Sequence, residues 1–326
     1  MKFIRTAGLF ALALAVLPHA GTAFAQDGSL KVGAIYMDAQ GFYAGVRKGI
    51  QDGAKDTGKK VDLVETNAQG DVSKESSFID SLISAGVKAI IVSPVSADGS
   101  YRAIRRAHDA GIPVVCYNTC LNDADMKQYV SAYAVGDPYD FGHKLGDAAA
   151  DYFLAEKKAA PKIAVLNCEF VEVCVTRRKG FEDALKAKVP GAQIVANQEG
   201  AILDKAVSVA GTMLSSNPDI DAFFGEAGGA TLGAARAVKS QGKTGKVVVF
   251  GGDMTTEIAQ ELADFTVIKA VVDISGQGLG KLALAQAVKA IDGKAPADIK
   301  VAYNIDLYKS SEDGKAWLKA HADGIP

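Results

Sequence analysis

The stretch over 31–54 reads KVGAIYMDAQGFYAGVRKGIQDGA, and it decides the fold. Its first seven residues are mostly apolar, which predicts a strand over 31–37. Apolar residues then recur at every fourth position from Phe42 to Ile50, which predicts an amphipathic helix over 42–57. A strand followed by a helix is the repeating part of the βαβ units that build parallel sheets.

The same alternation continues along the rest of the chain, with helical patterns between the strands and a final helix that contains Trp317. About 300 residues remain after the leader described below, more than one hydrophobic core usually holds, so the pattern predicts an α/β protein of two doubly wound lobes. The connection between 117 and 130 is predicted as a loop. The further strands are predicted at 61–66, 89–92, 112–117, 130–133, 162–167, 193–196, 221–226, 246–251, 267–273 and 303–308.

The first 25 residues have the features of a secretory signal peptide. Lys2 and Arg5 precede an apolar run over 7–17, and a small-residue triplet, Ala-Phe-Ala, ends at Ala25. A membrane anchor is the alternative, but this run is about half of the roughly 20 residues needed to span a bilayer. We therefore expect export to the periplasm with cleavage near Ala25.

The charge balance argues against a nucleic-acid partner. The formal net charge is -2 and the isoelectric point is about 6.1. Nucleic-acid binding depends on dense patches of Lys and Arg, and the composition gives no sign of such a patch. We therefore expect a small-molecule ligand rather than a polyanion.

All four cysteines, Cys116, Cys120, Cys168 and Cys174, follow the predicted leader. In an oxidising compartment close pairs are read as disulfides, and four cysteines allow three connectivities. We favour the local pairs, Cys116 with Cys120 and Cys168 with Cys174, because each bond would close one loop without linking distant segments. A zinc site is the alternative, although the spacings are not of the C-x2-C type and no His lies close by.

Polar and aromatic residues recur just after the predicted strands. In open parallel sheets a ligand binds outside the carboxyl ends of the strands, so these positions are candidates for a binding site. For any one of them a solvated loop or a helix cap is the simpler explanation, but their recurrence at the same end of successive strands favours a site. The candidates are Asp38, Gln40, Phe42, Tyr43, Asn118, Glu169, Arg177, Glu226, Asp253 and Asp273.

Several short motifs, in this order and spacing, resemble a known family. The resemblance is to the periplasmic sugar-binding proteins of the ribose and galactose type, which are type I periplasmic binding proteins and the substrate-binding components of ABC transporters. The ligand-binding core of the lactose-repressor family is related to them. The likeness extends from about Leu30 to Tyr308. The motifs are Gln40-Gly41-Phe42-Tyr43, Gly111-Ile112-Pro113-Val114-Val115, Arg177-Arg178-Lys179-Gly180-Phe181, Asn217-Pro218-Asp219-Ile220-Asp221-Ala222 and Gly251-Gly252-Asp253.

The resemblance implies two Rossmann-like lobes joined by a three-segment hinge, with a ligand cleft between them. The expected N-terminal lobe comprises 29–133 and 274–303. The expected C-terminal lobe comprises 134–273 and 304–326. Burying about 70 to 90% of a small ligand takes contacts from both lobes, so we expect hinge closure on the ligand.

The resemblance also implies a role for individual side chains. Phe42 and Tyr43 would form an aromatic wall, since the C–H faces of a sugar ring pack on aromatic faces. Arg177 would donate to ligand hydroxyls from the second lobe, while Asp253 and Asp273 would accept from them. Buried hydroxyls need such partners because water is excluded from the closed site.

The sequence departs from the ribose-binding pattern in three places. Asn118-Thr119 stand where that pattern has Asp-Arg. Ala227-Gly228 stand where it has Asn-Asp, which leaves Glu226 as the nearest polar replacement, either in the site or as an exposed carboxylate. The aromatic residue expected near Ala201 is missing. These differences favour a sugar or polyol other than ribose.

Catalytic apparatus is not visible in the sequence. Residues 275–281, SGQGLGK, lack the G-x4-G-K-[ST] spacing of a phosphate loop and are better explained as a tightly packed helix start. The sequence has no G-x-S-x-G or H-E-x-x-H motif, and its four histidines are scattered. We therefore expect no enzyme activity and no cofactor.

The sequence as a whole predicts a monomeric periplasmic protein that binds a sugar or polyol and delivers it to an ABC transporter permease. One alternative is a sensory protein that presents its ligand to a chemoreceptor or sensor kinase. Another is an exported carbohydrate-active enzyme. A transcriptional repressor is disfavoured because a signal peptide stands where a DNA-binding module would be.

Overall fold

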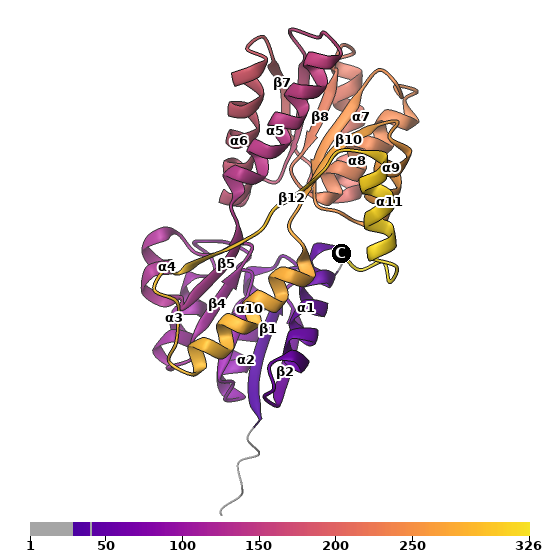
Figure 1. Ribbon diagram of the computed structural model, residues 1–326. Helices are drawn as coiled ribbons and strands as arrows, with labels where there is room; N and C mark the ends of the chain where they lie inside the picture. The colour runs from indigo at the N-terminus through magenta and orange to yellow at the C-terminus, as the bar shows by residue number, and fades with distance from the viewer. Residues whose placement is uncertain (1–28, 40) are drawn as a thin grey trace, which may run out of the picture.

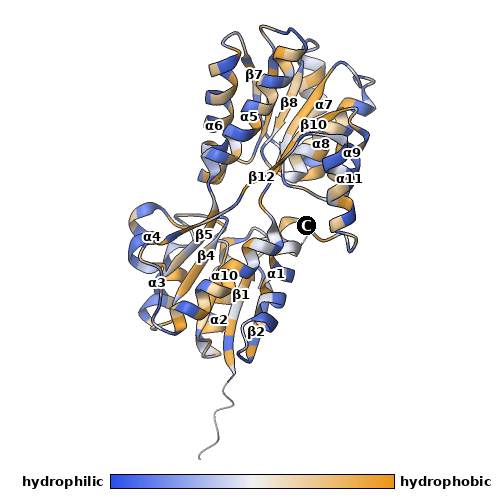
Figure 2. Cartoon of the chain, in the orientation of Figure 1, coloured by the Kyte–Doolittle hydropathy of each residue, from blue (hydrophilic) through white to orange (hydrophobic). Residues whose placement is uncertain are grey.

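The computed structural model describes residues 29–39 and 41–326, which form two α/β lobes (Figure 1). The predicted leader and Gln40 lie outside the described residues. Each lobe has a central sheet with helices on both faces, which confirms the predicted fold class. The strands are largely apolar and the hydrophilic residues gather on the outer helices (Figure 2). Among the described residues, no helix combines the length and apolar character needed to cross a membrane.

The N-terminal lobe holds a six-stranded sheet in the order β11-β5-β4-β3-β1-β2. All of its strand pairs are parallel. Its strands are β1 (Leu30–Tyr36), β2 (Val61–Asn67), β3 (Ala89–Val92), β4 (Val114–Tyr117), β5 (Ala132–Gly136) and β11 (Lys300–Tyr303). Its helices are α1 (Phe42–Asp56), α2 (Val72–Ser84), α3 (Tyr101–Asp109), α4 (Asp123–Tyr129) and α10 (Gly276–Ile291).

The C-terminal lobe repeats this arrangement with the order β12-β10-β9-β8-β6-β7. Only its edge strand β12 runs antiparallel to its neighbour, β10. Its strands are β6 (Lys162–Asn167), β7 (Gln193–Glu199), β8 (Ala222–Gly225), β9 (Val248–Gly252), β10 (Ile268–Asp273) and β12 (Asp306–Tyr308). Its helices are α5 (Pro138–Ala155), α6 (Glu172–Lys188), α7 (Leu203–Ser216), α8 (Gly228–Ser240), α9 (Thr256–Asp264) and α11 (Ser311–Ala320).

Local sequence explains the central elements. All four residues of β3, AIIV, are buried, as expected for a strand covered by helices on both faces. Asp71 caps α2 because its carboxylate accepts from the amides of Ser73 and Lys74. Pro138 stands in the first turn of α5, where its missing N–H costs nothing.

The chain passes between the lobes three times, from β5 to α5, from β10 to α10, and from β11 to β12 (Figure 1). The first passage leads into α5, which packs on α6, and the second leads into α10, which packs on α1. In each lobe the partner, α6 or α1, is the helix that follows the first strand of that lobe. Both contacts depend on glycine. A Cβ at Gly49 would overlap the carbonyl of Gln277 in α10, and a Cβ at Gly142 would overlap the carbonyl of Arg177 in α6.

Three sequence predictions were wrong in detail. The predicted loop between 117 and 130 contains α4, a helix of 7 residues capped by Asn122, too short for a clear apolar period. The sequence pattern predicts a helix near 177–188, but α6 begins at Glu172, more than one turn earlier. The predicted last strand, 303–308, is two short strands, one in each sheet. The predicted lobe boundaries put one passage of the chain between these two strands, at 303–304. We retain the predicted boundaries as a proposal.

Candidate functional site

The two predicted disulfides are present, and each lies at the carboxyl edge of one sheet. Cys116 and Cys120 close the turn after β4, with their Cα atoms 5.5 Å apart. Cys168 and Cys174 join the end of β6 to the first turn of α6, again with Cα atoms 5.5 Å apart. The local pairing is therefore confirmed, and the zinc alternative loses its thiolate ligands.

The N-terminal lobe contributes aromatic and uncharged polar groups. Phe42 and Tyr43 form the start of α1, and their rings meet edge to face with centroids 5.2 Å apart. The Tyr43 hydroxyl accepts from the Asn118 side-chain amide at 3.3 Å. The Tyr133 hydroxyl donates to the Asn118 carbonyl at 2.6 Å. Asn118 itself has a left-handed backbone, with φ of 59°, a conformation that Asn tolerates better than most residues.

Arg177 is the central charged residue on the side of the C-terminal lobe. It is only 6% exposed, and its Nη1 atom donates to the main-chain carbonyl of Glu226 at 2.8 Å. Its guanidinium carbon lies 3.9 Å from the centroid of the Phe141 ring, at cation–π distance. Its Nε atom is buried without a hydrogen-bond partner among the described residues. The Phe141 ring and the Glu226 carbonyl therefore fix the guanidinium while leaving donors unused.

Asp253 and Asp273 lie at the ends of β9 and β10, where the charge of Arg177 acts on Asp253 and the charge of Asp253 acts on Asp273. One carboxylate oxygen of Asp253 accepts from the Gly228 amide at 3.2 Å, and one of Asp273 accepts from the Met254 amide at 2.9 Å. Burial raises the pKa of Asp253, and the nearby Arg177 opposes that rise. Burial raises the pKa of Asp273 to about 7, against the Met254 hydrogen bond.

The groups of the two lobes face one another. Burial raises the pKa of Tyr43, hydrogen bonds from its own lobe lower it, and the charges of Asp253 and Arg177 act on it from the other lobe. Burial likewise raises the pKa of Tyr133, again against the charge of Arg177. The structure therefore brings Tyr43, Asn118, Arg177, Asp253 and Asp273 into one region between the lobes.

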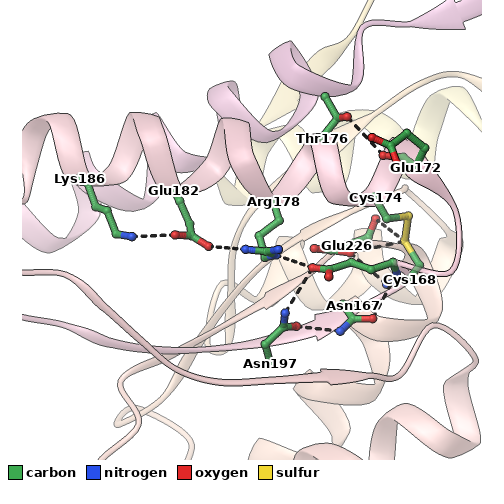
Figure 3. Close-up of polar contacts among 11 residues, drawn as sticks. Asn167, Cys168, Glu172, Cys174, Thr176, Arg178, Glu182, Lys186, Asn197 and Glu226 are labelled. Carbon is green, nitrogen blue, oxygen red and sulfur yellow. Dashed lines mark hydrogen bonds and ion pairs between the residues drawn. A yellow bond between two sulfur atoms is a disulfide. The ribbon is translucent and has the colours of Figure 1, made fainter. Parts of the chain in front are cut away.

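Figure 3 shows the polar surroundings of Glu226, Arg178 and Asn197 within the C-terminal lobe, and Glu169 contacts both Arg178 and Asn197. Glu226 is fully buried, and its Oε2 atom accepts from the Cys168 amide at 2.9 Å. Burial raises the pKa of Glu226 to about 8, although the Cys168 hydrogen bond opposes this. The carboxylate of Glu169 pairs with Arg178 and accepts from Asn197. Both carboxylates thus have partners inside their own lobe. Of the two alternatives for Glu226, burial excludes the exposed carboxylate.

Two cavities adjoin this region. One, of about 820 Å³, is lined by residues of both lobes, among them Tyr133 of β5. Val173 and Thr176 of α6 also line it, and both lie within about one helical turn of Arg177. The other, about 180 Å³, is lined by Asp38 and Tyr43 of the N-terminal lobe. Neither is lined by Arg177, Asp253 or Asp273. We place the site by the convergence of these charged groups with Tyr43 rather than by cavity volume.

Two residues that shape this region were not predicted from the sequence. Tyr133 lies inside β5, although it is the last residue of the strand predicted over 130–133. Its polar-tipped ring next to a strand end is a signal that could have been used. Phe141, under Arg177, gave no signal, because the contact depends on how α5 packs on α6.

Cys168, Cys174 and Glu226 form the one group in the described part of the chain whose ligand atoms lie close enough for a metal ion, within 4.8 Å of one another. The two sulfurs are joined in a disulfide, so they offer no thiolates in this state. The arrangement favours binding through hydrogen bonds and ring contacts.

The family described as periplasmic binding protein domain matches residues 33–295. The chain belongs to this family. Proteins of this family are substrate-binding components of ABC transporters rather than enzymes.

Individual periplasmic binding proteins match over most of the chain. The ABC transporter periplasmic-binding protein YphF of Escherichia coli is 57% identical over 99% of this chain and 99% of its own length. The D-allose-binding periplasmic protein of Escherichia coli is 30% identical over 73% of this chain and 81% of its own. A Mycobacterium smegmatis crystal structure in complex with β-D-fucofuranose is 25% identical, with a TM-score of 0.81, over 90% of this chain and 96% of that one.

Proposed function

We propose that this periplasmic binding protein captures a sugar or polyol between its lobes by hinge closure and delivers it to an ABC importer. The observation that carries the proposal is the meeting of Tyr43 and Asn118 from one lobe with Arg177 and Asp253 from the other. A polyhydroxylated ring needs an apolar face together with donors and acceptors, and this set provides all three.

The relatives support the ligand class. One of them is named for D-allose and another was solved with β-D-fucofuranose. The residues that differ from the ribose-binding pattern, Asn118-Thr119 and Ala227-Gly228, favour a ligand other than ribose. We include Phe42 in the site as the partner ring of Tyr43 and assign Glu226 a supporting position behind Arg177.

Export and delivery complete the proposal. The sequence over 1–25 has the pattern of a cleavable signal peptide, and the family is periplasmic. The partner is then the permease of an importer in the inner membrane, reached by the monomeric, ligand-loaded protein.

Isothermal titration calorimetry of the mature chain against aldopentoses, aldohexoses, furanose sugars and polyols tests the ligand class. We expect a dissociation constant in the range of about 1 µM or below for one member, since transport ligands are bound from dilute solution. Small-angle scattering with and without that ligand tests closure, because the radius of gyration falls when the lobes approach. If no sugar or polyol binds, or if the bound sugar is chemically altered on incubation, the proposed function is wrong.

A further inference from the structure

Residues Asp323–Pro326 follow α11 of the C-terminal lobe but lie against the N-terminal lobe. In Figure 1 the end of the chain, marked C, lies next to α1. We call these four residues the strap. They make a contact between the lobes separate from the three passages of the chain.

The strap is held to its own lobe at Gly324. The carbonyl of Gly324 accepts from the Thr256 hydroxyl, at the start of α9, at 3.5 Å. Gly324 has a φ of 73°, a left-handed conformation that glycine adopts without strain, and the chain turns there. Helix α11 packs closely on α9, since a Cβ at Gly314 would overlap the backbone of Ala263.

The other end of the strap is held to the N-terminal lobe. The side-chain amide of Gln277 in α10 donates to the Ile325 carbonyl at 2.8 Å. Pro326 is buried against α1, where a Cβ at Gly45 would overlap its carbonyl oxygen. The Asp323 carboxylate lies 4.0 Å from the Lys48 ammonium, at the limit of an ion pair. One hydrogen bond, one buried ring and one weak ion pair therefore join the strap to α1 and α10.

These two helices matter for ligand binding. Helix α1 starts with Phe42 and Tyr43, and α10 begins directly after the passage from β10. Because the strap is fixed at Gly324 to one lobe and at Ile325 and Pro326 to the other, separation of the lobes would break its contacts. A contact present in only one of two conformations shifts the population toward that conformation.

We propose that the strap is a latch that favours the approached lobes and thereby raises the affinity for the ligand. The effect on affinity rests on the proposed function, whereas the effect on lobe separation does not. A ligand that binds only the approached state gains apparent affinity in proportion to the population of that state.

Two variants test the latch. The first lacks residues 323–326, and the second is Gln277→Ala, which removes one hydrogen bond and leaves the chain complete. The matched control is Lys281→Ala, one turn further along α10, where Lys281 pairs with Asp56 inside the N-terminal lobe at 3.2 Å. Each is compared with the wild type by small-angle scattering without ligand and by calorimetry with the sugar or polyol that the wild type binds.

We expect a larger radius of gyration for the ligand-free deletion variant, a smaller increase for Gln277→Ala, and none for Lys281→Ala. The dissociation constant should rise about three- to tenfold on deletion and about twofold for Gln277→Ala. Unchanged scattering by both strap variants would overturn the latch. If the deletion variant loses its circular dichroism, Gln277→Ala decides. If the wild type binds no sugar or polyol, the proposed function fails and scattering alone decides the latch.

Discussion

The two lobes have the same frame but different chemistry at the edge where they meet. The sheet orders correspond strand for strand, so β3 matches β8 and β4 matches β9. Buried Ser93 follows β3, and fully buried Glu226 follows β8. Asn118 follows β4 and Asp253 follows β9, with backbone φ of 59° and 53°. Equivalent positions thus keep the same backbone while one lobe uses neutral groups and the other ionisable ones.

This difference separates two tasks. The N-terminal wall of Tyr43, Asn118 and Tyr133 offers rings and neutral hydrogen bonds, which recognise the shape of a ligand. The C-terminal wall of Arg177 and Asp253 offers charge, which strengthens each hydrogen bond and makes it depend on pH.

Glu226→Gln should change how stability depends on pH. The folded-state pKa of Glu226 is raised to about 8, so the folded protein holds a proton that the unfolded chain releases above its ordinary pKa. Stability contributed by this group therefore falls as pH rises from about 4.5 to about 8, by an amount on the order of 5 kcal/mol. Glutamine stays neutral, so urea unfolding at pH 5 and 9 should differ less in the variant. Ser93→Ala, at the equivalent position of the other lobe, should change the unfolding free energy equally at pH 5 and pH 9. An equal change at the two pH values for Glu226→Gln would refute the difference proposed between the lobes.

Arg177→Ala should weaken ligand binding by about 2 kcal/mol or more, because a charge-assisted bond is lost and its acceptors stay buried. Arg178→Ala is the matched control, since Arg178 pairs with Glu169 and Glu182 on its own lobe. Calorimetry of both variants, with thermal unfolding to verify the fold, measures the difference. Equal affinities for Arg177→Ala and the wild type would remove Arg177 from the site.

Replacing either pair of cysteines by alanine should cost about 2 kcal/mol of unfolding free energy, because the two closed loops are of similar length. Ligand affinity should fall more for the Cys168 and Cys174 pair, since that bond adjoins Glu226, whose carbonyl holds Arg177. Urea unfolding and calorimetry test both statements. A greater loss of affinity from the Cys116 and Cys120 pair would reverse the proposed ranking.

Tyr43→Phe should have the smallest effect, about 1 kcal/mol of binding free energy, because the ring remains and only neutral hydrogen bonds, with Asn118 and with the Met37 sulfur, are lost. The loss should not vary between pH 6 and pH 8, in contrast to the loss for Asp273→Asn, because burial raises the pKa of Asp273 to about 7. Calorimetric titration of both variants with the ligand at pH 6 and pH 8 measures the two losses of binding free energy. A loss for Tyr43→Phe that changes with pH would contradict the neutral role of the N-terminal wall.

The fold was largely predictable from the sequence because strand and helix periodicities alternate without interruption. The buried run of β3 was located correctly. The sequence left the cap of α2 open between Asp71 and Ser73, and the structure has Asp71 as the cap. Two of the three errors fell on short elements, namely α4 and the pair β11 and β12, where tertiary contacts decide the structure and the local pattern is too brief. The third was the start of the long helix α6.

The candidate site was predictable where side chains follow strands, as at Asn118 and Asp253, because topology brings those ends together. The direction in which each side chain points was not predictable. Glu226 follows a strand as Asp253 does, yet its carboxylate lies on the Cys168 amide inside the lobe. Whether a side chain points into a site or beneath it depends on packing between helices distant in sequence, such as α5 and α6.

The glycine-lined pairing of α1 with α10 has a consequence for biosynthesis. Helix α10, which covers α1, begins at Gly276, so most of the sequence must be made before the N-terminal lobe can be completed. A nascent chain that has emerged only as far as β5 lacks both α10 and β11. It would leave apolar surface uncovered and remain open to chaperones, a state suited to passage through a translocation channel before folding.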